Sequence, residues 1–167
     1  LEDIRNAMAH LHEAGLLTKT YNMIGIPGET IEQALETLKL NMELRPTWGR
    51  CSIISPYPNT ELWNIGVAQG KLEPMAANEF SDNYTDETLF DLEDKHQFIN
   101  LQRWFQVCVR FPFLYPLVRR LIRLPQNFLV DLMGRFVFGY YGSLYFGYRL
   151  STKVKYALTF LRTGQPI

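Results

Sequence analysis

Apolar residues follow two different periods in the first part of the chain, and the two periods predict a strand, a helix and a second strand. Residues 21–26 alternate in the way of a strand that is covered on both faces, and residues 51–55 form a second short apolar segment. Apolar residues that recur at helical spacing also predict two flanking helices, over residues 2–14 and 61–69. The central helix is predicted from apolar positions at helical spacing, namely Ile31, Ala34, Leu35, Leu38 and Met42.

Proline, glycine and capping residues set the boundaries of these elements. Pro27 and Gly28 interrupt the chain after the first strand, and Thr30 with Gln33 has the spacing of a capping box that opens a helix. The second strand is followed by Ser-Pro-Tyr-Pro-Asn-Thr, whose prolines prevent its continuation as a central strand. A strand, a helix and a strand with short connections form a βαβ unit with parallel strands, so both turns are expected beyond the carboxyl ends of neighbouring strands. Parallel α/β folds bind ligands at that edge.

The rest of the chain is predicted to be an acidic connection followed by helices. Between residues 71 and 94 helical spacing fades and acidic residues accumulate, which indicates a linker or surface crossover. Residues 96–110 return to helical spacing, and residues 111–116 form a break between two prolines. Further helices are predicted over residues 117–124, the first half of residues 126–148, and residues 149–161.

The two turns carry a resemblance to a known family. The Gly-Ile-Pro-Gly-Glu-Thr turn at residues 25–30, followed about thirty residues later by Ser-Pro-Tyr-Pro-Asn-Thr-Glu-Leu, resembles the fifth and sixth strand segments of radical S-adenosylmethionine (radical SAM) enzymes. It is most similar to the branch with oxidative cyclase-like and cobalamin-binding members, which carry Gly-Leu-Pro-Gly-Glu-Thr and Pro-Tyr-Pro-Gly-Thr at this spacing. Here Ile26 replaces the leucine, and Asn59 replaces the glycine of Pro-Tyr-Pro-Gly-Thr. The resemblance covers roughly residues 1–72.

The resemblance implies a fold and a chemistry. The fold class would be α/β, with residues 1–72 as the carboxyl-terminal βαβ part of a (β/α) barrel, residues 73–94 as a linker, and residues 95–167 as a mostly α-helical region. The intact protein would cleave S-adenosylmethionine reductively at a [4Fe–4S] cluster and abstract hydrogen from a small-molecule substrate. A flavodoxin or ferredoxin would supply the electron. Whether a cobalamin domain precedes the barrel, and whether the outcome is methylation, cyclisation or another rearrangement, stays open.

Cofactor contacts are implied for one group of residues and substrate contacts for another. The turn at residues 25–30 would approach the adenosine, Ile24 would contact adenine, and Asn22 would be a polar group inside the barrel. The alternative for this turn is an ordinary strand-to-helix connection, and for Tyr57 a packing aromatic residue in a rigid turn. Glu29 fits the first turn of a helix better than an acid–base role. The implied cofactor set is Asn22, Ile24, Gly25, Pro27 and Ser55, and the implied substrate-side set is Tyr57 and Asn59.

Cysteine content separates this chain from the cluster site of the family. Family members hold the cluster with three cysteines in a Cys-x3-Cys-x2-Cys loop, and this chain contains two cysteines, Cys51 and Cys108. We therefore expect no catalytic residue and no metal ligand here, and interpret the chain as the carboxyl-terminal portion of a longer polypeptide. Both cysteines fit buried small apolar residues.

Charge is divided unevenly along the chain. Residues 1–90 contain 6 Lys and Arg against 13 Asp and Glu, and residues 91–167 contain 11 against 4, so the two parts carry −7 and +7. A basic, aromatic segment over residues 117–148 suits an anionic membrane surface, but packing of a helical subdomain on the acidic part, or on a missing barrel segment, is the favoured interpretation. No motif supports nucleic-acid binding.

These patterns leave two interpretations of the whole chain. The first is a cytoplasmic radical SAM enzyme, with or without contact to a membrane surface. The second is a membrane-peripheral or protein-interaction module without catalysis. A different enzyme that binds a phosphate or nucleotide at residues 25–30 is disfavoured, because the Gly-Lys-Ser/Thr and Gly-x-Gly-x-x-Gly patterns are missing. No run of apolar residues reaches the length of a membrane-spanning helix.

Overall fold

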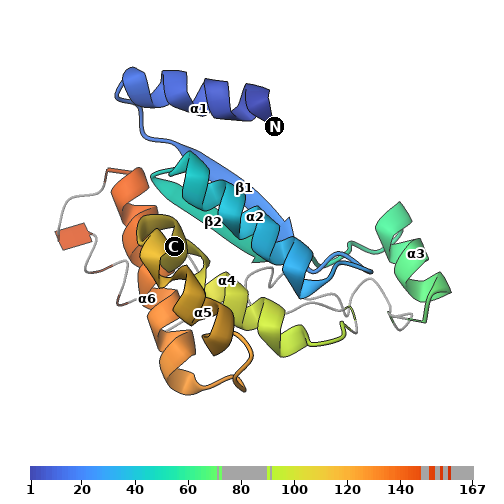
Figure 1. Ribbon diagram of the computed structural model, residues 1–167. Helices are drawn as coiled ribbons and strands as arrows, with labels where there is room; N and C mark the ends of the chain where they lie inside the picture. Colours follow the sequence, from blue (N-terminus) through green and yellow to red (C-terminus); the bar gives the residue numbers. More distant parts are fainter. Residues whose placement is uncertain are drawn as a thin grey trace.

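Two parallel strands and the helix between them form the centre of the structure (Figure 1). The computed structural model describes residues 1–70, 72, 90, 92–147, 151, 152, 155 and 158. Strands β1 (Lys19–Ile24) and β2 (Trp48–Ile53) pair in parallel, and α2 (Ile31–Leu44) connects them. The predicted βαβ unit is confirmed, and both strands begin earlier in the sequence than predicted.

Helix α2 has the boundaries that its sequence predicts. The Thr30 hydroxyl accepts a hydrogen bond from the backbone N–H of Gln33, and the Gln33 side chain accepts one from the backbone N–H of Thr30 at 2.8 Å. The helix ends at Arg45, whose φ of 49° lies in the left-handed region before Pro46. The predicted apolar face is confirmed, because its central members are buried, namely Ala34, Leu35 and Leu38.

The other helices surround this unit in chain order. Helix α1 (Glu2–Glu13) precedes β1, and α3 (Glu61–Ala68) follows β2; both project away from the centre (Figure 1). Helix α4 (Lys95–Arg110) packs against β2, α2 and α6. A 3₁₀ turn, η2 (Pro112–Leu114), leads into α5 (Tyr115–Leu121), and α6 (Phe128–Tyr145) follows. The helix expected over residues 149–161 lies largely outside the described residues, as does most of the acidic segment 73–94.

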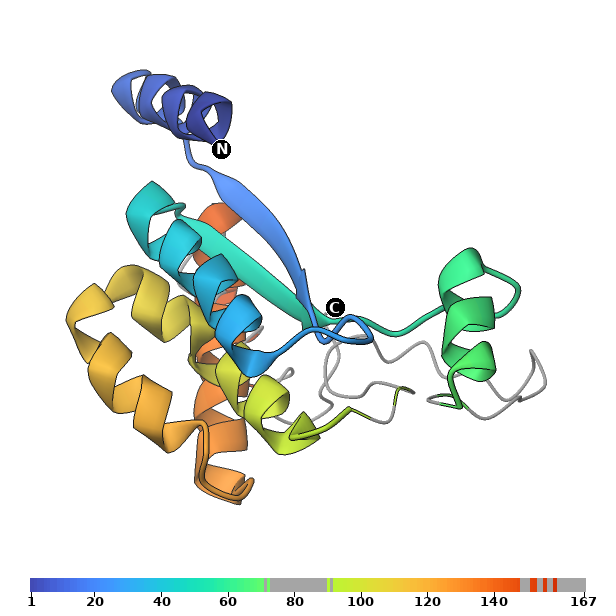
Figure 2. The same ribbon diagram turned by 45° about the vertical axis from the view of Figure 1, so that its right-hand side comes forward.

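One hydrophobic core joins the first part of the chain to the carboxyl-terminal helices. Helices α2 and α4 lie on the same side of the strands, and Figure 2 shows α2 and α4 next to each other below the strands. The predicted apolar face of α4 is confirmed as part of this core. Residues from both predicted regions therefore bury surface together, and the core includes Ile24, Leu38, Ile53, Phe98, Leu101, Phe105, Cys108, Val118 and Ile122.

The prediction that residues 126–148 are helical only in their first half is wrong, because α6 continues to Tyr145. Glycines inside this helix allow close packing. A Cβ atom on Gly142 would lie 3.2 Å from the Trp48 ring, and one on Gly134 would collide with the side chain of Arg103. Tertiary contact with β2 and α4 therefore compensates for the low helix propensity of glycine.

The prediction that β1 is covered on both faces is also wrong for this chain. Thr20, Asn22 and Ile24 face α2, whereas Tyr21 and Met23 point the other way and are 72% and 63% exposed. The apolar side of α1 is similarly uncovered, apart from Met8. Among the described residues, no helix combines the length and apolar character that crossing a membrane requires.

Candidate functional site

The two motif turns leave the sheet side by side. Ile24 lies opposite Ile53 in the parallel register, and the Ile54 N–H donates to the Ile24 carbonyl at 2.9 Å. Residues 25–30 and 55–60 therefore start at the same level, beyond the carboxyl ends of adjacent strands (Figure 1). This arrangement matches the edge at which parallel α/β folds bind ligands.

The first turn is closed by the carboxylate of Glu29. Its Oε2 accepts hydrogen bonds from the backbone N–H of Gly25 at 2.5 Å and of Ile26 at 3.1 Å. Gly25 and Gly28 have φ values of 82° and 89°, a region that side chains disfavour. A Cβ atom on Gly25 would also lie 3.1 Å from the Ile53 side chain. Glu29 thus has a structural role in the turn, and the glycines are required by the backbone.

The backbone conformation at Asn59 in the second turn explains why asparagine can stand in place of the glycine of Pro-Tyr-Pro-Gly-Thr. Asn59 has a φ of 67°, and asparagine tolerates this left-handed conformation better than most residues. Thr60 then caps α3: its hydroxyl accepts from the Trp63 N–H at 3.2 Å and donates to the Tyr57 carbonyl at 2.7 Å. The Tyr57 ring is half exposed beside this turn. Tyr57, Asn59 and Ser55 therefore lie together at the edge expected for them.

Asn22 and Ile24 lie on the side of the sheet that α2 covers, which corrects the expected direction of their side chains. Asn22 Nδ2 donates to the Arg50 carbonyl at 3.0 Å and to Asn41 Oδ1 at 3.2 Å, and Asn41 Nδ2 donates to Asn22 Oδ1 at 2.7 Å. Ile24 is fully buried in the core. The partner that a polar Asn22 requires is thus Asn41 on α2, and a ligand on the opposite face would meet neither side chain.

The opposite side of the strands carries a different set of side chains, here called the open sheet face. Lys19 lies 4.3 Å and Arg50 lies 5.8 Å from the centre of the Tyr21 ring, measured from Lys Nζ and Arg Cζ. Lys19 lowers the pKa of the Tyr21 phenol, chiefly by a hydrogen bond, and both cations add a Coulombic effect. Strand pairing places the members of this face next to one another, namely Lys19, Tyr21, Met23, Trp48, Arg50 and Ser52, of which Trp48 is buried against α6.

Sequence reasoning did not single out the open sheet face. The signal is present in the alternation of residues 21–26, which puts Tyr21 and Met23 on the side opposite Asn22. What the alternation alone did not reveal was which side α2 covers. The part-buried hydrogen bonds of Thr20 and Asn22 with Asn41 show which side α2 covers, since the Thr20 hydroxyl also donates to Asn41 Oδ1 at 2.6 Å.

The outer flank of the first turn is acidic, in contrast to the open sheet face, which carries Lys19 and Arg50. A hollow of about 280 Å³ lies between this turn and the start of α4. Its lining includes four acidic residues, Glu29, Glu32, Glu93 and Asp94. A ligand with a carboxylate or phosphate is therefore repelled on this flank and attracted on the open sheet face, where Lys19 and Arg50 lie.

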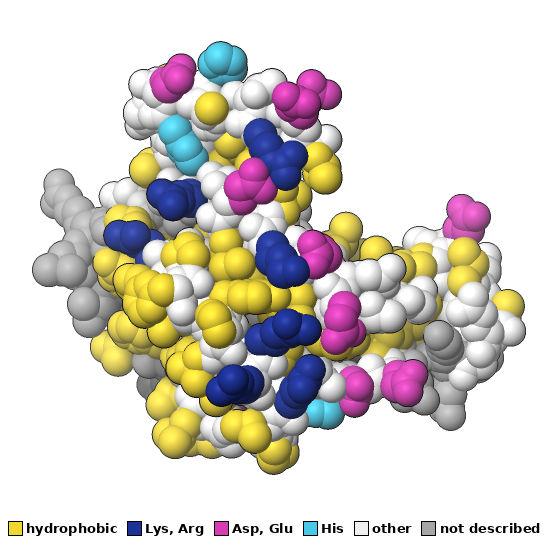
Figure 3. Space-filling model, in the orientation of Figure 1, with side chains coloured by type: hydrophobic (Ala, Val, Ile, Leu, Met, Phe, Trp, Pro, Cys, Tyr) yellow, Lys and Arg dark blue, Asp and Glu magenta, His cyan; other side chains and the backbone are white. Residues whose placement is uncertain are grey.

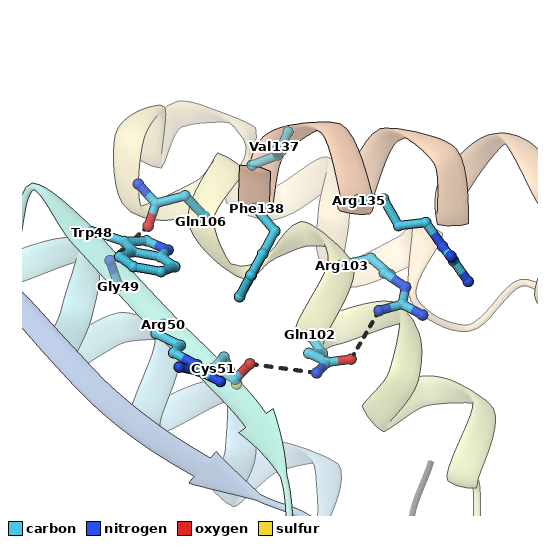
Figure 4. A pocket seen from close by; sticks show the side chains of 11 residues that line it. Trp48, Gly49, Arg50, Cys51, Gln102, Arg103, Gln106, Arg135, Val137 and Phe138 are labelled. Carbon is cyan, nitrogen blue, oxygen red and sulfur yellow. Dashed lines mark hydrogen bonds between the residues drawn. The ribbon is translucent and has the colours of Figure 1, made fainter. Parts of the chain in front are cut away.

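A small pocket lies along the free edge of β2, between this strand, α4 and α6 (Figure 4). Its cavity volume is about 40 Å³, which suits a few water molecules rather than an organic substrate. Gln106 Oε1 accepts from the Gly49 N–H at 2.7 Å, and Gln102 Nε2 donates to the Cys51 carbonyl at 3.4 Å. The two glutamines of α4 therefore satisfy backbone groups that a further strand would otherwise pair.

The two cysteines have the environment of buried thiols. Burial raises the pKa of Cys51, and the nearby charge of Glu29 raises it further; burial also raises the pKa of Cys108, to about 12. Iron–sulfur clusters require thiolates, so these residues do not fit cluster ligation. Among the described residues, no group of three or more His, Cys, Asp or Glu side chains could hold a metal ion.

Comparisons of the chain with protein families, with curated proteins and with solved structures found no match. The site is therefore defined by its own geometry. It consists of two glycine- or asparagine-containing turns at the carboxyl ends of adjacent parallel strands, next to a sheet face that carries two cations. Such an arrangement can bind a small ligand with an anionic group and an apolar or aromatic part.

Proposed function

We propose that this chain forms part of the cofactor and substrate wall of a radical SAM enzyme. The observation that carries the proposal is the placement of the turns at residues 25–30 and 55–60 side by side, beyond the carboxyl ends of paired strands. In a (β/α) barrel these turns surround the mouth. The resemblance of the two motifs would then have a common structural reason, because both would face one ligand.

Closure of the β2 edge supports β2 as the last strand of such a barrel. On this edge the Gly49 N–H and the Cys51 carbonyl form hydrogen bonds with the side chains of Gln106 and Gln102, and not with another strand. The β1 edge has no strand beside it among the described residues. A partial barrel would therefore continue on the β1 side, with the open sheet face turned toward its interior. Phe138 and Tyr145 of α6 pack around Trp48 at the start of β2. They would close the barrel at the amino-terminal end of its strands.

A cation and an exposed aromatic ring on the open sheet face support the proposal, since they could meet the carboxylate and the adenine of S-adenosylmethionine. This molecule would be held at the first turn by the backbone around Gly25 and Pro27, with Ser55 nearby, and its carboxylate would be attracted to Arg50 on the open sheet face. Tyr57 and Asn59 would face the substrate. Asn22 and Ile24 would act indirectly, by fixing β1 against α2.

The cluster does not fit residues of this chain, so its ligands would come from outside the 167 residues. When bound, S-adenosylmethionine and a [4Fe–4S] cluster together supply a radical that removes hydrogen from substrate. The residues described here would orient the bound molecules and exclude water. Cytoplasmic localisation, an electron-donor protein and a small-molecule substrate belong to the same proposal.

Electron paramagnetic resonance of the whole protein that contains this chain tests the proposal. The protein would be prepared without oxygen, reconstituted with iron and sulfide, reduced, and measured with and without S-adenosylmethionine. A [4Fe–4S] signal that changes on addition of S-adenosylmethionine is the expected result. A folded protein that binds no cluster would overturn the assignment.

A pair of matched variants tests the position of the site. Arg50→Gln removes a cation from the open sheet face, and Lys39→Gln removes one from the exposed side of α2, where Lys39 pairs with Glu36 at 2.6 Å. We expect Arg50→Gln to weaken S-adenosylmethionine binding about tenfold, as expected for one charged contact, and Lys39→Gln to leave it unchanged. Equal effects of both variants would place the ligand elsewhere.

A further inference from the structure

A second surface of the protein combines exposed apolar side chains with arginines, at the corner between α5 and α6. Arg119, Arg120 and Arg123 line one surface hollow together with Tyr115 and Pro116, and this set is here called the arginine groove. Large apolar residues in the same stretch of chain point outward, and they are here called the apolar rim: Phe113, Leu117, Leu124, Phe128 and Leu129. In Figure 3, dark blue side chains form a column on the front of the molecule, with yellow side chains to its left and below it and magenta side chains along its right.

The exposure of the apolar rim is high for residues of this size. Phe113 is 76% exposed, Phe128 is 74% and Leu129 is 73%. Phe128 and Leu129 start α6, and the Asn127 side chain caps that helix by accepting from the Val130 N–H at 3.0 Å. Two adjacent apolar side chains are thus presented to solvent by a capped helix start. Clustered exposed apolar groups mark interaction surfaces.

The corner is held rigidly from inside. Val118 and Ile122 are buried in the core, and the buried Asn100 of α4 donates to the carbonyls of Ile122 at 3.0 Å and Leu124 at 2.7 Å. These contacts fix the inner side of α5 and its carboxyl end against α4. The opposite side, with the three arginines, therefore faces outward in a defined arrangement.

The arginine groove carries uncompensated positive charge. None of Arg119, Arg120 and Arg123 has an acidic partner within salt-bridge distance in the part of the chain that the structure describes. Lys39 lies nearby, 5.9 Å from the Tyr115 ring, but its charge is paired with Glu36 at 2.6 Å, so the unpaired charge on this surface comes from the three arginines. A partner for this surface must therefore offer negative charge next to an apolar phase.

We propose that this corner docks the protein on an anionic lipid membrane. The rim residues would enter the boundary between head groups and acyl chains, while the arginines would contact lipid phosphates. A nucleic acid would satisfy the arginines but leave Leu117, Leu124 and Leu129 in water. The protein would lie on the membrane rather than cross it. This inference does not depend on radical chemistry at the other site.

The structure narrows the surface that the sequence indicated. The basic, aromatic segment spans residues 117–148, but Phe138 and Gly142 in the second half of α6 pack against β2. The Phe138 ring lies 5.3 Å from the Trp48 ring, and Gly142 lies against the same tryptophan. The docking surface is therefore the corner formed by residues 113–129.

Vesicle flotation of the whole protein tests the proposal. The probes are vesicles of phosphatidylcholine alone and vesicles that also contain phosphatidylglycerol. We expect binding to the anionic vesicles at low salt, little binding to the neutral ones, and release near 1 M salt, where the screening length falls to about 3 Å. Equal binding to both kinds of vesicle, or none to the anionic kind, would overturn the proposal, as would binding to a nucleic acid or an acidic protein alone.

Variants assign the binding to the corner. Arg119→Gln, Arg120→Gln and Arg123→Gln together should weaken partitioning on the order of 100-fold, since each basic residue near an anionic surface contributes roughly fivefold. Phe128→Ser with Leu129→Ser should weaken it about tenfold or more. The matched control is Leu16→Ser with Leu17→Ser, two exposed residues after α1, which should bind as the unaltered protein does.

Two outcomes with these variants would contradict the assignment. If the arginine variant still floats with anionic vesicles as the unaltered protein does, the arginine groove is not the contact. If the control loses binding equally, binding is not confined to the corner. Circular dichroism establishes that each variant is folded, and Arg120→Gln alone, with an expected loss of roughly fivefold, replaces the triple variant if that one does not fold.

Discussion

The side-chain amides of Asn22 and Asn41 exchange hydrogen bonds between β1 and α2. Asn41 Nδ2 donates to Asn22 Oδ1 at 2.7 Å, and Asn22 Nδ2 donates to Asn41 Oδ1 at 3.2 Å. Asn41 is almost completely buried, and it also donates to the Thr37 carbonyl at 2.9 Å within its own helix. The pair fixes the strand against the helix and determines which side of the sheet remains open.

Replacing Asn41 by leucine should destabilise the fold. The change leaves Asn22 and the Thr20 hydroxyl without the acceptor they share, so we expect the free energy of unfolding to fall by about 2–3 kcal/mol. Urea denaturation measures the difference. Asn6→Leu on the exposed side of α1 is the control, with an expected change near zero.

The double variant Asn22→Leu with Asn41→Leu distinguishes a hydrogen-bonded pair from two independent residues. Because both amides are removed together, the loss should be smaller than the sum of the two single losses. Losses that simply add would mean that the two side chains do not support each other.

Glu29 is expected to stabilise the first turn rather than to exchange protons. Glu29→Ala removes the acceptor for the N–H groups of Gly25 and Ile26, and should lower the free energy of unfolding by about 1–3 kcal/mol. Glu29→Gln keeps one acceptor oxygen and should cost less. Thermal denaturation compares these variants with Glu32→Ala, an exposed carboxylate in the first turn of the same helix. Equal stability of Glu29→Ala and Glu32→Ala would contradict the role.

Gln106 is expected to protect the edge of β2. Gln106→Leu leaves the buried N–H of Gly49 unpaired, which should lower the free energy of unfolding by about 1–3 kcal/mol. Hydrogen exchange gives a local measurement, because the Gly49 amide should exchange faster in the variant. The exposed Gln69→Leu should leave that amide protected. Unchanged protection of Gly49 in Gln106→Leu would show that another group covers the edge.

Both cysteines should be unreactive in the folded protein. Burial raises the pKa of Cys51, and raises that of Cys108 to about 12, so little thiolate forms near pH 8. Alkylation should therefore be more than about 100-fold slower than in guanidinium chloride, where both thiols are exposed. Rapid labelling of either cysteine before unfolding would contradict its buried position.

The same thiols make stability depend on pH in the alkaline range. Because the folded pKa of Cys108 is raised, its contribution to stability is complete below about pH 8.5, the ordinary thiol pKa, and is lost as pH rises toward about 12. Between about pH 8 and pH 10, the free energy of unfolding should therefore fall less for Cys108→Ala than for the unaltered protein. Parallel urea curves at these two pH values measure the difference, and an identical pH dependence of both proteins would contradict it.

Local signals in the sequence were sufficient for the central unit. The period-two segments, the capping pair Thr30 and Gln33, and the left-handed positions at Gly28 and Asn59 are each determined by neighbouring residues, because turns and caps depend on φ and on bonds that span three or four residues. The parallel βαβ arrangement follows from short connections, and the adjacency of the two turns follows from it.

Contacts between residues far apart in the sequence determine which face of β1 is buried and how far α6 extends, and the pattern of apolar residues does not reveal either. Alternation divides β1 into two faces, but the network of Thr20 and Asn22 with Asn41 determines which face is buried and leaves Tyr21 with Lys19 and Arg50 on the other. The glycines of α6 reduce helix propensity, yet the helix continues because they allow approach to Arg103 and Trp48. Burial and long-range hydrogen bonding depend on packing between segments, so only the tertiary structure could place the open sheet face and the docking corner.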